Sequence, residues 1–400
     1  MVQPPLQSHS TEEIENVLIY VCDSLRYDSF PDRVREMGVS GRAIATSTFT
    51  ATGFSSILTG VYPVTHQVWN FEDSLAERPP LLTWNDQSGI DATRVWRNVD
   101  NPAKKPPLRL CGETEETTLA QLESPFTLVV HDRGGHMTYG HSDESEKWSS
   151  HEDFFDELAR KPDEINRLYN EGVDESVKRF EELVRTLESW NELENTLVVF
   201  TSDHGELLGE YGGLYDHGAP IAPELINVPL VFAGAGLPRG ERFNGLLSTA
   251  DIAPTALSAM GSGVSGADGH DLWTNGLPQS RVARTEVWKQ TSYSGIEYKA
   301  AGVWTSAGGH VRHLNPFQSR LLHLLGVHFY LAPYANIVRR PSRGHIALAN
   351  AYLRRSVNYG EPLSEALVDD YLVTDFTRRE GGNVPPQPDT EQLRQLGYLE

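Results

Sequence analysis

The sequence has few cysteines and no long apolar stretch. Its two cysteines, Cys22 and Cys111, can form neither a disulfide framework nor a thiolate metal motif, which favours a reducing compartment. The first ten residues lack a basic segment followed by an apolar one, so we expect no signal peptide. No apolar run is long enough to predict a transmembrane helix. We therefore expect a cytoplasmic protein.

Basic residues are also scarce. The chain carries 34 Lys and Arg against 55 Asp and Glu, a formal net charge of -21. This balance argues against a nucleic-acid-binding surface, because phosphate backbones require a basic footprint. Acidic residues are spread along the chain, and the seven lysines are Lys104, Lys105, Lys147, Lys161, Lys178, Lys289 and Lys299. Dispersed acid with little lysine resembles the composition of proteins from salt-loving archaea, so we expect a halophilic protein.

The length of 400 residues allows one large α/β domain and a smaller subdomain. We expect a disordered lead over residues 1–11, a catalytic core over 12–278 and a C-terminal α+β subdomain over 279–400 that packs on the core. The core should hold a mainly parallel sheet flanked by helices. Residues 320–338 are apolar with interleaved histidines, and two interpretations stay open: a helix packed on the core, or a helix at a membrane interface.

Three short apolar runs end in the same kind of residue. Residues 16–21 lead to Asp23, residues 126–130 lead to His131 and Asp132, and residues 196–201 lead to Asp203 and His204. Such runs, separated by helical patterns, are typical of buried parallel strands. Ligands of open α/β sheets bind outside the carboxyl ends of the strands. Because crowded carboxylates repel each other, this convergence predicts a metal site.

Thr50 is the candidate nucleophile. It lies shortly before a segment that begins a helix near Phe54, where backbone N–H groups favour an anion. A threonine hydroxyl activated by a metal can attack an ester of an oxyanion there. The alternative is that Thr50 is an ordinary helix cap.

These signals together resemble the alkaline phosphatase superfamily, and its sulfatase-like branch in particular. The resemblance is carried by Asn16-Val-Leu-Ile-Tyr-Val-Cys-Asp23-Ser24-Leu-Arg26, by Thr50 before Leu58-Thr59-Gly60, by Thr201-Ser-Asp203-His204-Gly205-Glu206, by Asn227-Val-Pro-Leu-Val, by Asp251-Ile-Ala-Pro-Thr255 and by the ending Leu393-Arg-Gln-Leu-Gly-Tyr-Leu. Each motif is short, but their order is specific. The resemblance implies an alkaline-phosphatase-like core and a metal-dependent ester hydrolase.

The resemblance also implies two divalent cations, Zn²⁺ or Mn²⁺. One would be held by Asp23, Asp203 and His204, with Thr50 bridging to it. The motif Asp132-Arg-Gly-Gly-His136 resembles the second-metal motif of nucleotide pyrophosphatase/phosphodiesterases, which implies a second cation held by Asp132, His136 and His217. Arg133 lies between two of these ligands and would bind a nonbridging ester oxygen, unless it is a salt-bridge partner. His131, Tyr139 and His141 would orient the ligands.

Two departures from the sulfatase pattern affect the predicted chemistry. Ser24 stands where typical sulfatases have a second acid, and Thr50 stands where they have the Cys or Ser that becomes formylglycine. Threonine cannot give that aldehyde by the same oxidation. We therefore predict hydrolysis of a phosphate mono- or diester through Thr50. The alternatives are a sulfuric ester hydrolase, a phosphotransferase or mutase, and a non-catalytic binding module. The expected partner is a small phosphate or sulfate ester, and the sequence does not fix the oligomeric state.

Overall fold

The fold is taken from a computed structural model. It describes residues 3–10, 13–95, 99, 101–141, 147–148, 150–263, 265–290, 296–340 and 343–379. The C-terminal motif that begins at Leu393 lies outside these ranges.

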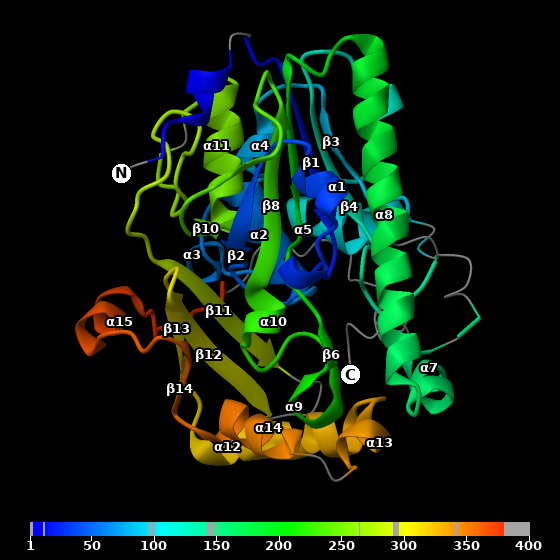
Figure 1. The fold of residues 1–400 in the computed structure, drawn as a ribbon, viewed down its shortest axis with the longest axis vertical. Helices are drawn as coiled ribbons and strands as arrows, with labels where there is room; N and C mark the ends of the chain where they lie inside the picture. The colour runs from blue at the N-terminus through cyan, green and yellow to red at the C-terminus, as the bar shows by residue number, and fades with distance from the viewer. Residues whose placement is uncertain are drawn as a thin grey trace.

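The core is built on an eight-stranded sheet (Figure 1). Its strands are β1 Asn16–Cys22, β2 Val39–Ile44, β3 Ser88–Asp91, β4 Thr127–Asp132, β5 Thr196–Thr201, β8 Asn227–Gly234, β9 Glu241–Arg242 and β10 Leu247–Ser248. The order is β10-β2-β8-β5-β1-β4-β3, and β9 pairs with β2. Strand β1 runs parallel to both β4 and β5, whereas β8 runs antiparallel to β5 and β2. The prediction of a mainly parallel sheet is confirmed.

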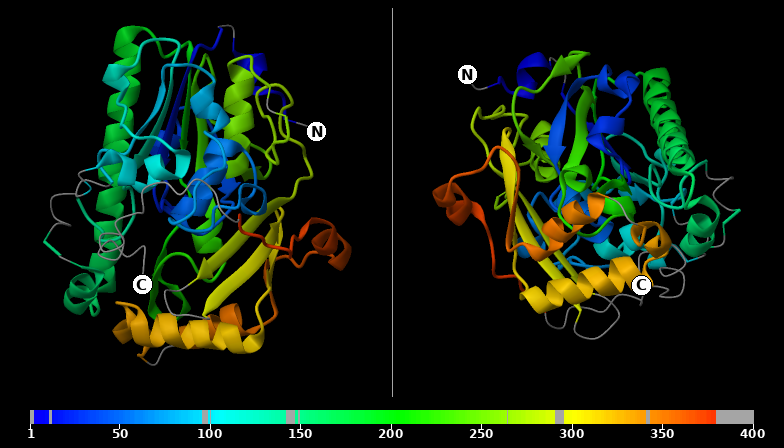
Figure 2. Two further views of the ribbon diagram at one scale, coloured as in Figure 1. Left: turned by 180° about the vertical axis from the view of Figure 1, so that it is seen from behind. Right: turned by 60° about the horizontal axis from the view of Figure 1, so that its bottom comes forward.

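Helices cover both faces of the sheet. Helix α8, Pro162–Trp190, lies along one face, and α2, Thr50–Thr59, and α11, Ile252–Ala259, lie along the other (Figures 1 and 2). The apolar stripe of α8 is buried because its members recur at helical spacing; it includes Ile165, Leu168, Val173, Val177, Phe180 and Val184. Shorter elements connect these layers: η1 Leu6–His9, η2 Tyr27–Ser29, α1 Asp32–Arg35, α3 Pro63–His66, α4 Pro80–Thr83, η3 Pro102–Lys104, α5 Pro106–Cys111, η4 Leu119–Gln121, α7 His151–Leu158, β6 Leu207–Gly209, α9 Glu210–Gly213, β7 Leu214–Asp216, α10 Pro223–Ile226 and η5 Thr249–Asp251.

The C-terminal subdomain is an antiparallel sheet with helices beneath it (Figure 2). Its elements are β11 Ala283–Gln290, β12 Glu297–Trp304, β13 Gly308–His313, α12 Phe317–His323, the π-helix η6 Leu324–Leu331, α13 Ala335–Val338, α14 Gly344–Leu353, β14 Ser356–Gly360 and α15 Glu365–Tyr371. Strand β11 attaches to the core, because the N–H of Glu286 donates to the carbonyl of Thr46 over 2.8 Å. None of the helices in the described ranges combines the length and the apolar character that a membrane span requires.

Residues 3–10, which lie within the lead expected to be disordered, make backbone hydrogen bonds to the core. The N–H of Gln3 donates to the carbonyl of Leu277 and the N–H of Leu6 to that of Leu272, both over 3.1 Å. Leu6 is buried at the edge of the core. Burial of this apolar side chain, together with the backbone hydrogen bonds, offsets the entropy lost on ordering the segment.

Candidate active site and metal centre

Three side chains converge at the carboxyl ends of the central strands. Asp23 follows β1, His131 lies near the end of β4, and Asp203 follows β5. These strands are parallel neighbours, so their carboxyl ends lie at one edge of the sheet. Nε2 of His131 is 3.6 Å from Oδ2 of Asp23 and 3.7 Å from Oδ2 of Asp203, and all three side chains are fully buried. Sequence reasoning gave His131 only an orienting role, whereas the structure places it between the two carboxylates.

The charges of this group require compensation. Burial and the neighbouring carboxylate of Asp203 raise the pKa of Asp23. Burial also acts to raise the pKa of Asp203, but His204 and His131 outweigh it and lower that pKa. Both ring nitrogens of His131 and Oδ2 of Asp203 have no hydrogen-bond partner among the residues described. Ligand atoms of Asp23, His131 and Asp203 lie within 4.8 Å of one another. Buried oxygen and nitrogen atoms in this arrangement fit a divalent cation.

The hydroxyl of Thr50 faces a histidine beside this group. Oγ1 of Thr50 lies 3.0 Å from Nε2 of His204. Nδ1 of His204 lies 2.8 Å from the carbonyl of Gly205, which assigns the ring proton to Nδ1 and the lone pair to Nε2. Burial lowers the pKa of His204 to about 4, so the ring is neutral at pH 7. Nε2 is also 3.6 Å from Oδ1 of Asp23 and 3.7 Å from Oδ2 of Asp203. The structure thus brings together the four residues predicted around the first metal.

Helix α2 holds Thr50 in this position. The helix begins at Thr50, after Phe49 in an extended conformation, so the hydroxyl lies at the helix N-terminus, where the N–H groups of Thr52 and Gly53 donate to the carbonyl of Phe49. The helix passes close to β5 because Gly53 has no side chain: a Cβ there would lie 2.6 Å from the carbonyl oxygen of Asp203. Phe54, one helical turn after Thr50, packs its ring edge-on to the ring of His131, with centroids 5.0 Å apart.

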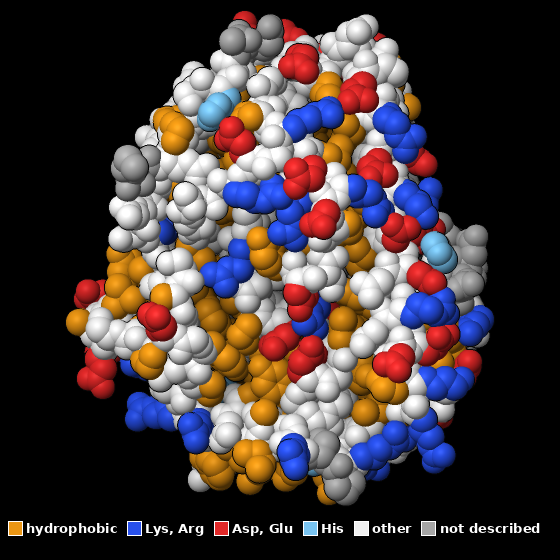
Figure 3. Space-filling view, in the orientation of Figure 1, with side chains coloured by type: hydrophobic (Ala, Val, Ile, Leu, Met, Phe, Trp, Pro, Cys, Tyr) orange, Lys and Arg blue, Asp and Glu red, His pale blue; other side chains and the backbone are white. Residues whose placement is uncertain are grey.

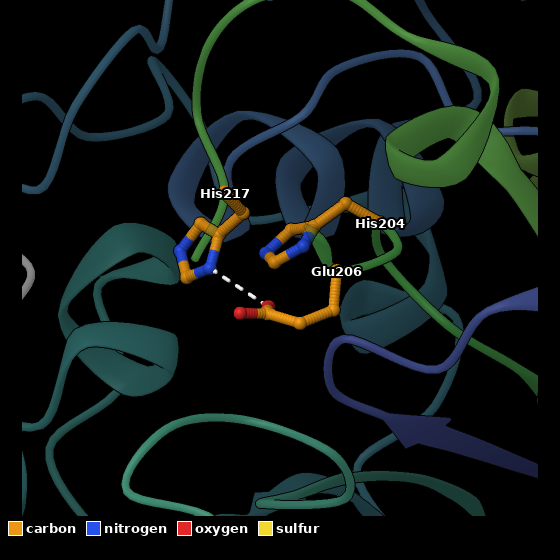
Figure 4. Close-up of side chains that lie close together, drawn as sticks. All are labelled: His204, Glu206 and His217. Carbon is orange, nitrogen blue, oxygen red and sulfur yellow. Dashed lines mark hydrogen bonds and ion pairs between the residues drawn. The ribbon is translucent and has the colours of Figure 1, made fainter. Parts of the chain in front are cut away.

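A second group of possible ligands lies on the hairpin that follows β5. It consists of His204, Glu206 and His217, whose side chains point toward one another (Figure 4). Nδ1 of His217 is 3.2 Å from Oε2 of Glu206 and 3.0 Å from Oδ1 of Asp216. The hydroxyl of Tyr139 donates to Oε1 of Glu206 over 2.7 Å. Glu206 and His217 offer oxygen and nitrogen donors to a second cation, whereas Nε2 of His204 is directed at Thr50.

The pKa values of Glu206 and His217 are both raised, but for different reasons. Burial raises the pKa of Glu206. Burial also acts to lower the pKa of His217, but Asp216 and Glu206 outweigh it and raise that pKa. Sequence reasoning missed Glu206, although it lies inside a motif used for the family resemblance. The signal was a carboxylate three residues after Asp203 in an apolar segment.

Of the second predicted ligand set, His136 and His217 lie together and Asp132 does not. The rings of His136 and His217 have centroids 5.1 Å apart. Asp132 accepts from Arg179 of α8 over 2.7 Å, and Arg179 also donates to Asp91 over 2.7 Å. Successive residues of a strand face opposite sides of the sheet, so His131 faces the site and Asp132 faces α8. The structure therefore pairs Asp132 with Arg179 and not with His136 and His217, and the predicted role of Asp132 as a ligand stays a prediction.

The other polar residues of this region take defined places. Arg133 donates to the carbonyl of Gly140 over 3.5 Å and lines a small cavity with Gly172 and Glu175. Its role in binding the ester stays a prediction. Nδ1 of His141 lies 3.9 Å from Oε2 of Glu175.

Comparisons with known proteins agree with this architecture. The family model described as Sulfatase matches residues 109–262. The chain is 39% identical over 417 residues, covering all of both chains, to the low-salt glycan biosynthesis sulfotransferase Agl7 of Haloferax volcanii. Its fold resembles the phosphonate monoester hydrolase of Agrobacterium radiobacter, with a TM-score of 0.57, 16% identity and coverage of 75% of this chain and 87% of the other. A solved 2-O GAG sulfatase, BT1596, has a TM-score of 0.57, 14% identity and coverage of 93% and 99%.

Proposed function

The chain belongs to the sulfatase-like branch of the alkaline phosphatase superfamily, and from this premise we propose that it is a metal-dependent enzyme that cleaves sulfuric or phosphoric esters through Thr50. The observation that carries the proposal is the 3.0 Å contact between Oγ1 of Thr50 and Nε2 of neutral His204, beside two buried carboxylates. A hydroxyl held by a base at a helix N-terminus is the usual arrangement of an activated nucleophile.

A divalent cation held by Asp23, His131 and Asp203 would supply Lewis acidity toward the ester oxygens. His204 orients the hydroxyl of Thr50 and accepts its proton as the oxygen attacks sulfur or phosphorus. The bond from sulfur or phosphorus to the leaving alcohol breaks, and the departing oxygen takes that proton from His204. The N-terminus of α2, where the helix dipole favours negative charge, faces the anionic group as it is transferred to Thr50. Water then attacks sulfur or phosphorus, the bond to Oγ1 of Thr50 breaks, and the proton that water loses returns to Thr50 through His204.

The choice between sulfate and phosphate is the finer part of the proposal. Thr50 attacks directly, because threonine does not provide the aldehyde of typical sulfatases. A directly attacking hydroxyl supports the phosphate mono- or diester predicted from the sequence. A sulfuric ester remains the alternative, since a phosphonate monoester hydrolase and a sulfatase share the fold.

A second candidate is transfer of the group to another hydroxyl in place of water. The observation that favours it is the similarity over the full length of both chains to the Haloferax volcanii protein, which is named a sulfotransferase of glycan biosynthesis. In that reaction the Thr50–O–sulfur bond breaks, a sugar hydroxyl forms the new bond, and its proton leaves through His204. The first half of the reaction is the same in both candidates.

The test is a product analysis with nitrophenyl phosphate, bis-nitrophenyl phosphate and nitrophenyl sulfate, each with Zn²⁺ or Mn²⁺, with and without a sugar acceptor. Free phosphate or free sulfate identifies the hydrolase, and a modified sugar identifies the transferase. Metal-loaded protein that turns over none of these esters would contradict the proposal and favour a binding module.

We include a cytoplasmic location in this proposal. Cys22 and Cys111 are both free, buried thiols, which fits a reducing compartment.

A further inference from the structure

The base of the C-terminal subdomain differs in charge from the rest of the chain. Residues 298–360 contain no Asp or Glu, whereas the whole chain carries 55. The same segment supplies exposed arginines on the base, at Arg339, Arg340, Arg343, Arg354 and Arg355. Among the residues described, none of these five side chains forms an ion pair with a carboxylate; Arg339 and Arg340 donate to backbone carbonyls instead. The base is therefore a basic surface on a protein whose net charge is -21.

The same base exposes large apolar side chains. Helices α12 and η6 bury Leu324 and Val327 against the subdomain, but their outer side is also apolar. Leu322 is 53% exposed, Tyr330 71% and Ile346 of α14 72%. Phe317 and Leu325 are exposed as well. A surface helix of a globular protein normally turns polar residues outward, so apolar character on both sides indicates a second apolar contact.

These helices form one layer. Nη1 of Arg320 in α12 donates to the carbonyl of Arg354 at the end of α14 over 3.1 Å. The rings of Phe329 in η6 and His345 in α14 have centroids 6.2 Å apart. The layer lies at the base of the molecule, with apolar and basic side chains visible there in the space-filling view (Figures 2 and 3).

We propose that this layer docks on an anionic lipid bilayer, and we call it the basal face: Phe317, Leu322, Leu325, Tyr330 and Ile346 with Arg339, Arg340, Arg343, Arg354 and Arg355. Apolar side chains enter the headgroup–acyl boundary, and arginines bind lipid phosphates while their stems stay in the apolar layer. A basic cluster without acids is the charge pattern that the anionic surface of a membrane attracts. A second copy of the chain is a poorer occupant, because pairing two basal faces brings arginine against arginine.

Helices α13 and α14, which adjoin the basal face, contact the hairpin that carries part of the candidate site. A Cβ at Gly212 would lie 2.6 Å from Cδ2 of His345, and a Cβ at Gly213 would lie 2.5 Å from Cγ2 of Ile337. Both glycines lie in α9, between Glu206 and His217. Docking of α13 and α14 on a bilayer would hold this hairpin close to the membrane plane. The docking proposal itself does not depend on which ester the site cleaves.

The test is co-sedimentation of the full chain with vesicles of equimolar phosphatidylglycerol and phosphatidylcholine, and with vesicles of phosphatidylcholine alone, at low and molar KCl. We expect binding to the anionic vesicles. Arg343→Glu with Arg354→Glu should weaken the partition roughly tenfold or more at low salt. Leu322→Ser, Tyr330→Ser and Ile346→Ser together should abolish the part of the binding that survives molar KCl, where charge is screened beyond about 3 Å. All these positions are exposed, so the variants should fold.

The matched control is Trp190→Ser with Arg239→Glu. Trp190 is 43% exposed at the end of α8 that lies away from the base, and the side chain of Arg239 is 68% exposed (Figure 1). This control should sediment with anionic vesicles like the unchanged protein. Wild-type protein that stays in the supernatant with anionic vesicles would overturn the proposal, and so would binding that the basal substitutions leave unchanged. A dimer in solution that the same substitutions dissociate would assign the face to a second copy instead.

Discussion

The hydroxyl of Thr50 and Nε2 of His204 lie 3.0 Å apart, where the first turn of α2 meets the loop after β5. The histidine is buried and neutral, with its other nitrogen committed to the carbonyl of Gly205. Only one ring atom is thus directed at the hydroxyl. This pair turns a possible helix-capping threonine into a candidate nucleophile.

Replacing Thr50 tests that assignment. Thr50→Ala should lower kcat by several orders of magnitude, because it removes the covalent route while the buried helix loses only a small group. Thr50→Ser keeps a hydroxyl beside His204 and should retain part of the activity. Turnover by both variants, with circular dichroism to check the fold, is the measurement. A near-normal kcat for Thr50→Ala would indicate direct attack by water.

The approach of α2 to β5 depends on Gly53, and this gives a second prediction. A methyl group at Gly53 would lie 2.6 Å from the carbonyl oxygen of Asp203, so Gly53→Ala should destabilise the fold by about 1–3 kcal/mol and displace Thr50 from His204. Alanine is otherwise the better helix former. The control is Gly263→Ala, where an added Cβ meets nothing within 4 Å. Chemical denaturation and turnover of both variants should separate them. Equal stabilities would show that α2 shifts without cost.

The sequence predicts the convergence of strands but not every side chain at the edge. Asp23, Thr50, Asp203 and His204 were found because each follows a strand or precedes a helix. Because side chains alternate between the two faces of a strand, only one of His131 and Asp132 can face the site. The motif that ends in His136 does not indicate that β4 extends through Asp132. Strand length, and so the face of its last residue, depends on the pairing of Asp132 with Cys22 of β1, which is a long-range contact. Order in the N-terminal lead likewise depends on residues near Leu272, far away in the sequence.

The position of Asp132 leads to a prediction about metal content. Metal-loaded protein should contain close to two divalent ions per chain, one for each ligand group. Asp203→Asn should lower that content, because its carboxylate lies in the first group. Asp132→Asn is the matched control. It should leave the metal content unchanged and cost about 2 kcal/mol of stability, because it weakens a buried ion pair that Asp91 still partly satisfies. Loss of metal from Asp132→Asn would restore Asp132 as a ligand.

Glu286 predicts a pH dependence of stability. Burial raises its pKa from 4.5 to about 7, although the N–H of Val64 donates to Oε2 over 2.8 Å. In the folded state the carboxyl group therefore holds its proton up to a higher pH than in the unfolded chain. Its stabilising contribution is fully present below 4.5 and is lost as the pH rises through about 7, by about 3 kcal/mol at most.

Glu286→Gln is uncharged at every pH and serves as the comparison. The free energy of unfolding of this variant, relative to the wild type, should rise between about pH 5 and about pH 8, since only the wild type ionises there. Denaturant titrations at both pH values give the difference, in which all other titrating groups cancel. A difference that stays constant with pH would mean that Glu286 ionises normally.

The net charge of -21 gives the last prediction, which concerns salt. Surface carboxylates repel each other when counterions are dilute, and the compact state suffers most. The Debye length falls from about 30 Å at 0.01 M to about 3 Å at 1 M, so molar KCl screens nearly all of this repulsion. The Tm of metal-loaded protein should therefore rise between dilute and molar KCl, and turnover should persist there. Sucrose is the control, because it is excluded from protein surfaces but screens no charge. A Tm that is flat or falls with KCl would refute the halophilic interpretation. An equal rise in sucrose would show that exclusion from the surface, and not screening, stabilises the fold.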